Sequence, residues 1–195
     1  MFTSAEPLAS PARRLPGDLA MWLFIFAELA VFGILILTFA VTQRLNSELF
    51  HEGRQALDSS IGLALTLSLL TSGLLAALAV EQVRQLRPLR AAWLLVAALA
   101  SACLYLVLKL EEYGHLLSLG LDLEANTFFT LYWLLTGFHF LHVLLGMLIL
   151  GWMANRCRLH AYGPGNCSAL ESGVLYWHMV DLVWVLLFPL VYLLN

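Results

Sequence analysis

Long apolar runs alternate with short polar connections along the chain. Five of these runs have roughly the 20 or more residues that an α-helix needs to cross a hydrocarbon layer. We expect the helices at about residues 18–41, 60–83, 89–111, 126–153 and 170–194. The pattern therefore predicts an all-α, polytopic membrane protein, with a five-transmembrane-helix bundle as a single membrane domain over residues 1–195.

Local signals support two of these helices. Pro16 and Gly17 introduce the first run, and Asp18 is placed to cap the free amides of its first turn. The second run carries small or hydroxylated residues, which allow helices to approach closely in a bilayer. They are Thr66, Ser68, Thr71, Ser72 and Gly73. We therefore expect the second helix to lie inside the bundle.

Composition agrees with a membrane protein. Hydrophobic residues make up 61% of the chain and charged residues 12%, which lies outside the usual range of soluble domains. The formal charge of -3 is small, so nothing indicates a nucleic-acid partner. The three cysteines form no C-x-x-C pair, which argues against a disulfide framework and against a thiolate metal site.

The distribution of basic residues predicts the orientation. With the N-terminus inside, the inner segments hold seven arginines: Arg13, Arg14, Arg84, Arg87, Arg90, Arg156 and Arg158. The outer segments hold Arg44, Arg54 and Lys109. Because Lys and Arg are retained on the cytoplasmic side, this asymmetry predicts a cytoplasmic N-terminus and a periplasmic or outer C-terminus.

Five ionisable side chains interrupt the apolar runs near their middle: Glu28, His139, His142, His178 and Asp181. His139 and His142 are three residues apart, as are His178 and Asp181, so each pair shares one helix face. Such groups are costly in hydrocarbon and turn toward other helices. We therefore expect the first, fourth and fifth helices to meet around a small buried polar centre.

Three interpretations of this centre remain open. It is a structural hydrogen-bond network, or a metal or haem site, or a proton or lipid-headgroup site built on Glu28. The chain has no H-E-x-x-H motif and no C-x-x-C-H motif, which weakens the metal interpretation. Trp177 and Trp184 lie seven residues apart on one helix face, which predicts packing against this protein or a partner.

Four blocks resemble subunit III of the haem-copper oxidases. The first is residues 21–28, which end at Glu28, and the second is Lys-Leu-Glu-Glu-Tyr at 109–113. The third is Thr-Gly-Phe-His-Phe-Leu-His-Val at 136–143, followed by Gly146. The fourth is Tyr-Trp-His-Met-Val-Asp-Leu-Val-Trp at 176–184. The blocks occur in family order and cover nearly the whole chain.

The resemblance implies a non-catalytic subunit of the bacterial inner membrane, without a cofactor of its own. The expected partner is a large haem-bearing catalytic subunit, with haem and non-haem iron or copper, that reduces nitric oxide or oxygen. A cytochrome c subunit and membrane lipids are further candidate partners. Glu28 matches the family's carbodiimide-reactive carboxylate, which is linked there to proton uptake by the neighbouring subunit.

Residues 15–22, His178-Met179 and residues 187–190 resemble the NorE branch of this family more closely. That branch is associated with bacterial nitric oxide reductase, so we expect an accessory subunit of that complex. One alternative is subunit III of a proton-pumping cytochrome c or quinol oxidase. Another, of a different class, is a free-standing haem or metal membrane enzyme that uses His139, His142 and His178.

Overall fold

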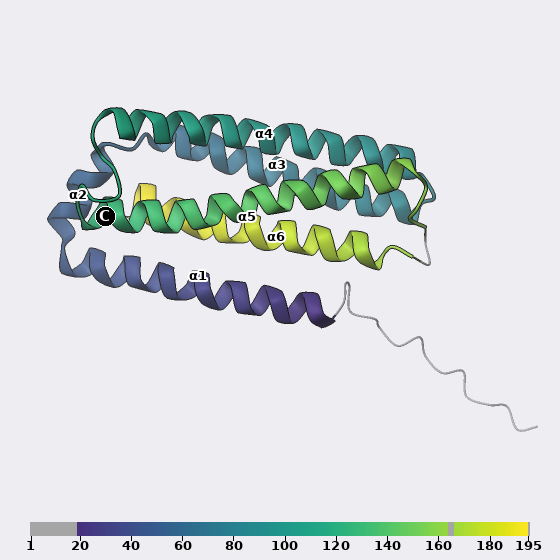
Figure 1. Cartoon of the computed structure of the whole chain (residues 1–195), viewed down its shortest axis with the longest axis horizontal. Coiled ribbons are helices and arrows are strands. Elements are labelled where there is room, and N and C mark those ends of the chain that lie inside the picture. Colours follow the sequence, from purple (N-terminus) through teal and green to yellow (C-terminus); the bar gives the residue numbers. More distant parts are fainter. Residues whose placement is uncertain (1–18, 164–165, 195) are drawn as a thin grey trace, which may run out of the picture.

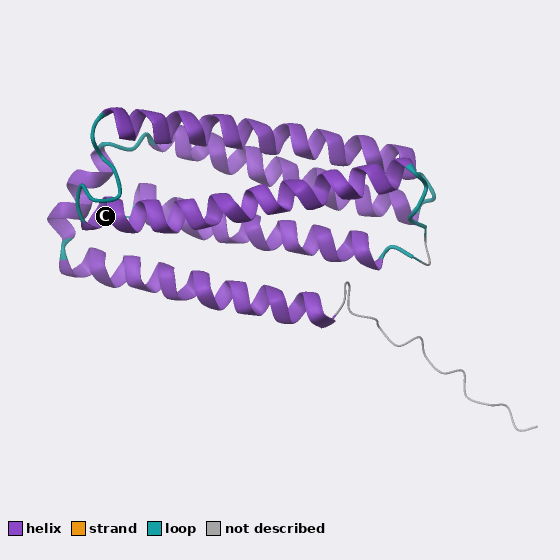
Figure 2. Ribbon diagram, viewed as in Figure 1, coloured by secondary structure: helices purple, strands orange, loops and turns teal. Residues whose placement is uncertain are grey.

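The computed structural model describes residues 19–163 and 166–194, and this part of the chain is helical without strands (Figures 1 and 2). The helices are α1 (Leu19–Leu45), α2 (Ser47–Gln55), α3 (Ser59–Arg84), α4 (Pro88–Ser118), α5 (Thr127–Arg158), α6 (Ser168–Phe188) and the π-helical turn η1 (Pro189–Leu193). Five helices are long and apolar enough to cross a membrane. The all-α prediction is therefore confirmed. The expected cap at Asp18 lies outside the described residues.

Four of the long helices form the core, and the fifth lies on its outside. α3 packs along α4 and α6, and α5 packs along the same two helices, while α1 rests against α5 and α6 (Figure 1). α1 buries a single ridge, Ile25, Phe32 and Phe39, with one residue every seven. Of the 18 most apolar consecutive residues of α1, only 17% are buried, compared with 61% in the span Ser168–Leu193, which comprises α6 and η1. α1 is therefore the loosest span and α6 the central one.

Short side chains hold α3 against α4. Ser72 Oγ donates to the Ala98 carbonyl at 2.8 Å, and Ser101 Oγ donates to the Ser68 carbonyl at 2.7 Å. Small residues let two backbones approach closely where lipid supplies no hydrophobic driving force. The predicted close packing of the small residues is confirmed, but the expected interior position of the helix is wrong, because Leu63, Leu67, Leu70, Leu74 and Leu78 lie exposed on its other face. Thr71 does not take part in this packing, because it is exposed and its hydroxyl donates to the Leu67 carbonyl of its own helix.

Several helices extend further than the sequence predicts. α4 was expected to end near residue 111 and continues to Ser118, and α5 was expected to end near residue 153 and continues to Arg158. Lys109 was assigned to an outer segment, which is wrong, since its side chain is fully buried within α4. Without Lys109, the predicted outer segments hold two basic residues, Arg44 and Arg54. The excess of arginines in the predicted inner segments therefore remains, and with it the reason for the predicted orientation.

The sequence did not indicate α2, which is short, polar and placed between two spans. Its buried face centres on Phe50, whose ring lies 5.1 Å from Phe39 and 5.3 Å from Phe128, in edge-on contacts. Gly53 packs directly against Phe128, where a side chain would collide. α2 thus ties the C-terminal end of α1 to the N-terminal end of α5 through the ring of Phe50.

α2 also caps the end of α6. Pro189 lacks an amide hydrogen, and the helix relaxes there into a π turn closed by the Leu194 amide on the Pro189 carbonyl. Arg54 donates to the carbonyls of Leu190 and Val191, both at 3.2 Å. Burial lowers the pKa of the Arg54 guanidinium from its ordinary value, but the group stays charged. It therefore satisfies carbonyls that the helix end leaves free.

Candidate functional site

A buried ion pair lies in the core beside η1. Lys109 Nζ lies 2.6 Å from Glu112 Oε2, and the two side chains are 0% and 5% exposed. The residues are three apart on α4, so helix geometry brings them onto one face. Two opposite charges this deep need mutual contact and further hydrogen bonds, because each alone would carry a large desolvation cost.

Two tyrosines complete this pair. Lys109 Nζ donates to the hydroxyl oxygens of Tyr132 and Tyr192, each at 3.1 Å. The Tyr192 hydroxyl donates to the Glu112 carboxylate, 2.8 Å from Oε1. The ammonium also lies 5.3 Å from the centre of the Trp184 ring, within cation–π range. The Lys109 centre, as we call Lys109, Glu112, Tyr132 and Tyr192, therefore joins α4, α5 and η1.

Sequence reasoning missed the Lys109 centre. Lys109 was counted in an outer segment, and neither tyrosine was identified as a candidate residue. A signal was available in the i,i+3 spacing of Lys109 and Glu112, which is the spacing used to pair His178 with Asp181.

Glu28 and His142 meet between α1 and α5, as the sequence predicts for their helices. His142 Nε2 lies 3.0 Å from Glu28 Oε2, with side-chain exposures of 11% and 20%. His142 Nδ1 donates to the Phe138 carbonyl at 2.8 Å. Since Nδ1 carries a hydrogen, the contact with Glu28 holds one proton, either on Nε2 or on the carboxyl. Both states are neutral overall, which suits a position inside a bilayer.

His139 lies one turn from His142 but does not join that pair. Its ring is fully buried, 5.1 Å from the Trp184 ring and 6.2 Å from the rings of Phe32 and Tyr105. Neither ring nitrogen has a hydrogen-bond partner among the described residues. His139 is therefore held by aromatic packing and not by polar contacts.

His178 and Asp181 face a third direction. They line an open groove between α3 and α6, together with Gly73 and five aliphatic side chains. The His178 side chain is 44% exposed, which corrects the expectation that it lies in a buried network, while that of Asp181 is 7% exposed. His178 Nδ1 lies 3.8 Å from Asp181 Oδ2, too far for a hydrogen bond.

The two tryptophans of α6 are both fully buried. Trp177 packs on Gly146 of α5, where an added Cβ would come within 2.5 Å of the indole. Trp184 Nε1 donates to Thr66 Oγ1 of α3 at 3.0 Å. Their shared face thus packs inside this protein, which is the first of the two environments that the sequence predicted for them.

The five candidate residues therefore do not form one centre. Glu28 and His142 pair across α1 and α5, His139 is enclosed by rings, and His178 and Asp181 open onto the groove beside α3. Within residues 19–163 and 166–194, no three His, Cys, Asp or Glu side chains gather in a group that could hold a metal ion. The three histidines thus offer no common ligand site in this part of the chain.

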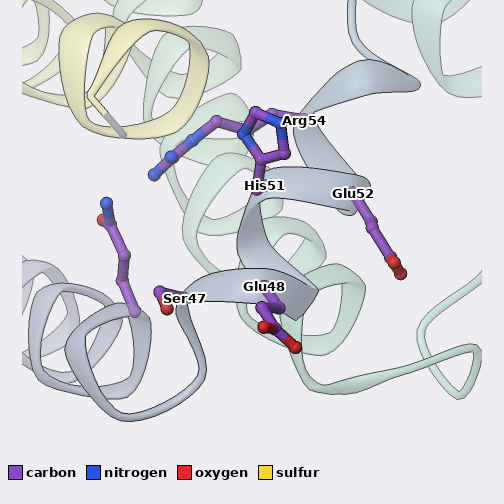
Figure 3. Close-up of a pocket in the computed structure, with 6 residues that line it drawn as sticks. Ser47, Glu48, His51, Glu52 and Arg54 are labelled. Atoms are coloured by element: carbon purple, nitrogen blue, oxygen red, sulfur yellow. The ribbon is translucent and has the colours of Figure 1, made fainter.

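A second hollow lies beside α2. Figure 3 shows its labelled side chains on α2, where the carboxylates of Glu48 and Glu52 point in different directions. The lining residues are Gln43, Ser47, Glu48, His51, Glu52 and Arg54. Arg54 is already engaged by backbone carbonyls, and Gln43 Nε2 donates to the Leu194 carbonyl at 3.0 Å. This hollow thus belongs to the cap on η1.

Comparison with known proteins gives the chain its family. Residues 16–195 match the family model of cytochrome c oxidase subunit III. A haem-copper oxidase subunit I+III of Aeropyrum pernix is 32% identical over 180 residues, which cover 89% of this chain and 22% of that protein. Probable quinol oxidase subunits 3 of Staphylococcus saprophyticus and Staphylococcus aureus are 24% and 26% identical, and each alignment covers 92% of this chain and 89% of the relative.

These relatives bear on the finer predictions. The three proteins named above are oxidase subunits, which favours the oxidase alternative over the expected nitric oxide reductase subunit. The NorE assignment has no support from them. The family-model match spans all five membrane helices and every candidate residue of the interior. This multi-pass membrane protein belongs to the cytochrome c oxidase subunit III family.

Proposed function

We propose that this chain is the accessory third subunit of an oxygen-reducing haem-copper oxidase in the cytoplasmic membrane of a bacterium. It has no redox cofactor of its own and assembles with a catalytic subunit that carries haem and copper. The observation that carries the proposal is the family match over residues 16–195. It is supported by a relative whose name joins subunits I and III in one protein.

The interior geometry suits a scaffold. The Lys109 centre and the Glu28–His142 pair each link two or more helices, and each satisfies its groups internally. In a bilayer such hydrogen bonds select which helices associate, because lipid tails offer no alternative partner. The polar groups therefore fix the packing of α1, α4, α5 and η1 without converging on a reaction site.

Glu28 has a structural role in this proposal. It holds the loosely packed α1 against α5 through His142, at a position where only a neutral pair is inexpensive. A contribution to lipid organisation or to proton uptake by the catalytic subunit would act through the same pair. A Glu28→Gln variant separates these roles, because an amide keeps a hydrogen bond to His142 and cannot release a proton.

Mild-detergent purification of the tagged full chain from its native membrane tests the proposal. We expect a haem protein to co-purify and the complex to consume oxygen with a cytochrome c or quinol donor. A complex that reduces nitric oxide instead would replace the oxidase with a nitric oxide reductase. Haem or a stoichiometric metal that stays with the chain after removal of all partners would favour the free-standing enzyme and overturn the proposal.

A further inference from the structure

We propose that the groove between α3 and α6 receives a transmembrane helix of the haem-bearing partner, and that this helix presents a hydrogen-bond acceptor to His178 near mid-membrane. The inference rests on the proposed function, because it names the docking face of the accessory subunit. We call the site the α3/α6 groove. Its lining residues are Leu70, Gly73, Leu74, His178, Asp181, Leu182, Val185 and Leu186.

The shape of the α3/α6 groove suits a helix. It is an open hollow of about 520 Å³ with aliphatic walls and one polar pair at its floor. Gly73 makes room for the Asp181 carboxylate, with which a Cβ at that position would collide. The aliphatic side chains along the open groove offer the van der Waals packing that drives helix association in lipid. A quinone ring, in contrast, is held in a pocket that encloses most of its surface.

The depth of the polar pair excludes the ordinary partners of a surface histidine. The α6 span runs over 26 residues from Ser168 to Leu193, and His178 and Asp181 stand near its middle. At about 1.5 Å per residue, they lie roughly 15 to 20 Å from the Ser168 end. A hydrocarbon core about 30 Å thick puts water and phospholipid headgroups out of reach of this depth.

The pair is incomplete in the isolated chain. Asp181 Oδ1 is buried without a hydrogen-bond partner in the described part of the protein, and the contact between His178 Nδ1 and Asp181 Oδ2, at 3.8 Å, is too long for a hydrogen bond. His178 is also the more exposed of the two mid-span histidines that face carboxylates, at 44% compared with 11% for His142. Acyl chains cannot accept a hydrogen bond from His178, so lipid in the groove would leave that side chain unsatisfied.

Proton counting decides what the occupant must carry. Near mid-membrane the pair is least costly when its total charge is zero. Because Nδ1 and Asp181 are too far apart for a hydrogen bond, both neutral states, carboxylate with imidazolium and carboxylic acid with imidazole, leave His178 with at least one N–H that this pair does not bind. A hydroxyl, side-chain amide or free backbone carbonyl on the incoming helix is the matching acceptor.

Two leucines give a matched test. Leu182 of the α3/α6 groove and Leu104 on α4 are both 52% exposed, so tryptophan at either site adds the same bulk outside the core. The full-length variants are tagged, expressed in the native membrane and purified in mild detergent. We expect L182W to lower co-purified haem per tagged chain about tenfold. L104W should stay within about twofold of the unchanged chain.

Exchanges at His178 test the hydrogen bond itself. His178→Leu should also reduce haem recovery, and His178→Gln should restore part of it, because the amide keeps a donor at that position. Equal haem recovery from L182W, L104W and the unchanged chain would overturn the docking face while leaving the proposed function intact. Absence of co-purified haem from the unchanged chain would overturn both.

The same purification separates the competing occupants. If L182W keeps its haem but loses a bound quinone or phospholipid that L104W retains, as measured by chromatography of the solvent extract, the groove holds that molecule and not a helix. If L182W alone fails to accumulate in the membrane, His178→Leu decides, since it removes polar bulk from an exposed site. Normal haem recovery in that variant would contradict the proposal.

Discussion

Two pairs of ionisable residues share the same spacing and have opposite surroundings. Lys109 and Glu112 are in contact, fully enclosed, and completed by two tyrosine hydroxyls. His178 and Asp181 are not within hydrogen-bond distance, open onto a groove, and leave one carboxylate oxygen without a partner among the described residues. The spacing gives each pair a common helix face, but the neighbouring helices decide whether that face is satisfied.

The comparison separates two uses of buried charge. A completed centre holds its own chain together, and removal of one member should cost stability. An incomplete pair costs energy in the isolated chain and gains from a partner, so its removal should affect assembly more than folding. Four sets of exchanges in the purified chain test this distinction, each measured by the free energy of unfolding in detergent.

The largest effect is expected at Lys109. Lys109→Met leaves Glu112 buried without its counter-ion, which should lower the free energy of unfolding by about 3–5 kcal/mol. Titration with a denaturing detergent, followed by helical circular dichroism, measures the loss. The double variant Lys109→Met with Glu112→Leu removes both charges and should recover most of the stability. A single variant as stable as the unchanged chain would end the distinction between the two pairs.

Tyr192→Phe should have the next largest effect. It deletes the hydroxyl that Lys109 donates to and that donates to Glu112, at an expected cost of about 1–3 kcal/mol. Tyr105→Phe is the matched control, since that tyrosine is equally enclosed and its hydroxyl has no partner among the described residues. The same titration should find the control neutral or stabilising. Equal losses would show that the hydrogen bonds of Tyr192 add nothing beyond the space that a buried hydroxyl fills.

The bond between Trp184 and Thr66 should contribute less. A double-mutant cycle of Trp184→Phe and Thr66→Val isolates the 3.0 Å hydrogen bond between α6 and α3 from the accompanying change in volume. Hydrogen bonds between membrane helices average about 0.6 kcal/mol and reach about 1.7 kcal/mol, so the coupling should fall in that range. A coupling of zero would mean that Trp184 acts only through its ring.

The smallest change is expected at His178. His178→Leu should alter the free energy of unfolding of the isolated chain by less than about 0.5 kcal/mol, because its contact with Asp181 is long and partly exposed. A loss comparable with that of Lys109→Met would show that the pair is structural after all. The comparison would then teach nothing about docking.

Hydropathy predicted the five spans because each helix must be apolar over roughly 20 residues to cross a membrane. The same reasoning misplaced the end of α4, since Lys109, Glu112 and His115 suggested a polar connection. Two of these three residues neutralise each other inside the bundle. The sequence does not reveal that Tyr132 and Tyr192, which lie 20 and 80 residues after Glu112, contact these charges.

The sequence identified the polar residues of the interior but not how they are arranged around one another. Depth in the spans identified Glu28, His139, His142, His178 and Asp181, and the contact between Glu28 and His142 agrees with the expectation that their helices meet. Which face of α6 turns toward α3 depends on Gly73 and Trp184, whose packing partners lie far away in the sequence. Periodicity places residues on a helix face but does not say what that face contacts.

The members of the Lys109 centre are synthesised at different times, because Tyr192 follows Glu112 by eighty residues. The ribosome delivers the tyrosine eighty residues after Glu112, so α4 reaches the translocation machinery with its ion pair still short of a hydroxyl. The ion pair is thus made before the hydroxyl that completes it, and the centre closes only after η1 has been synthesised.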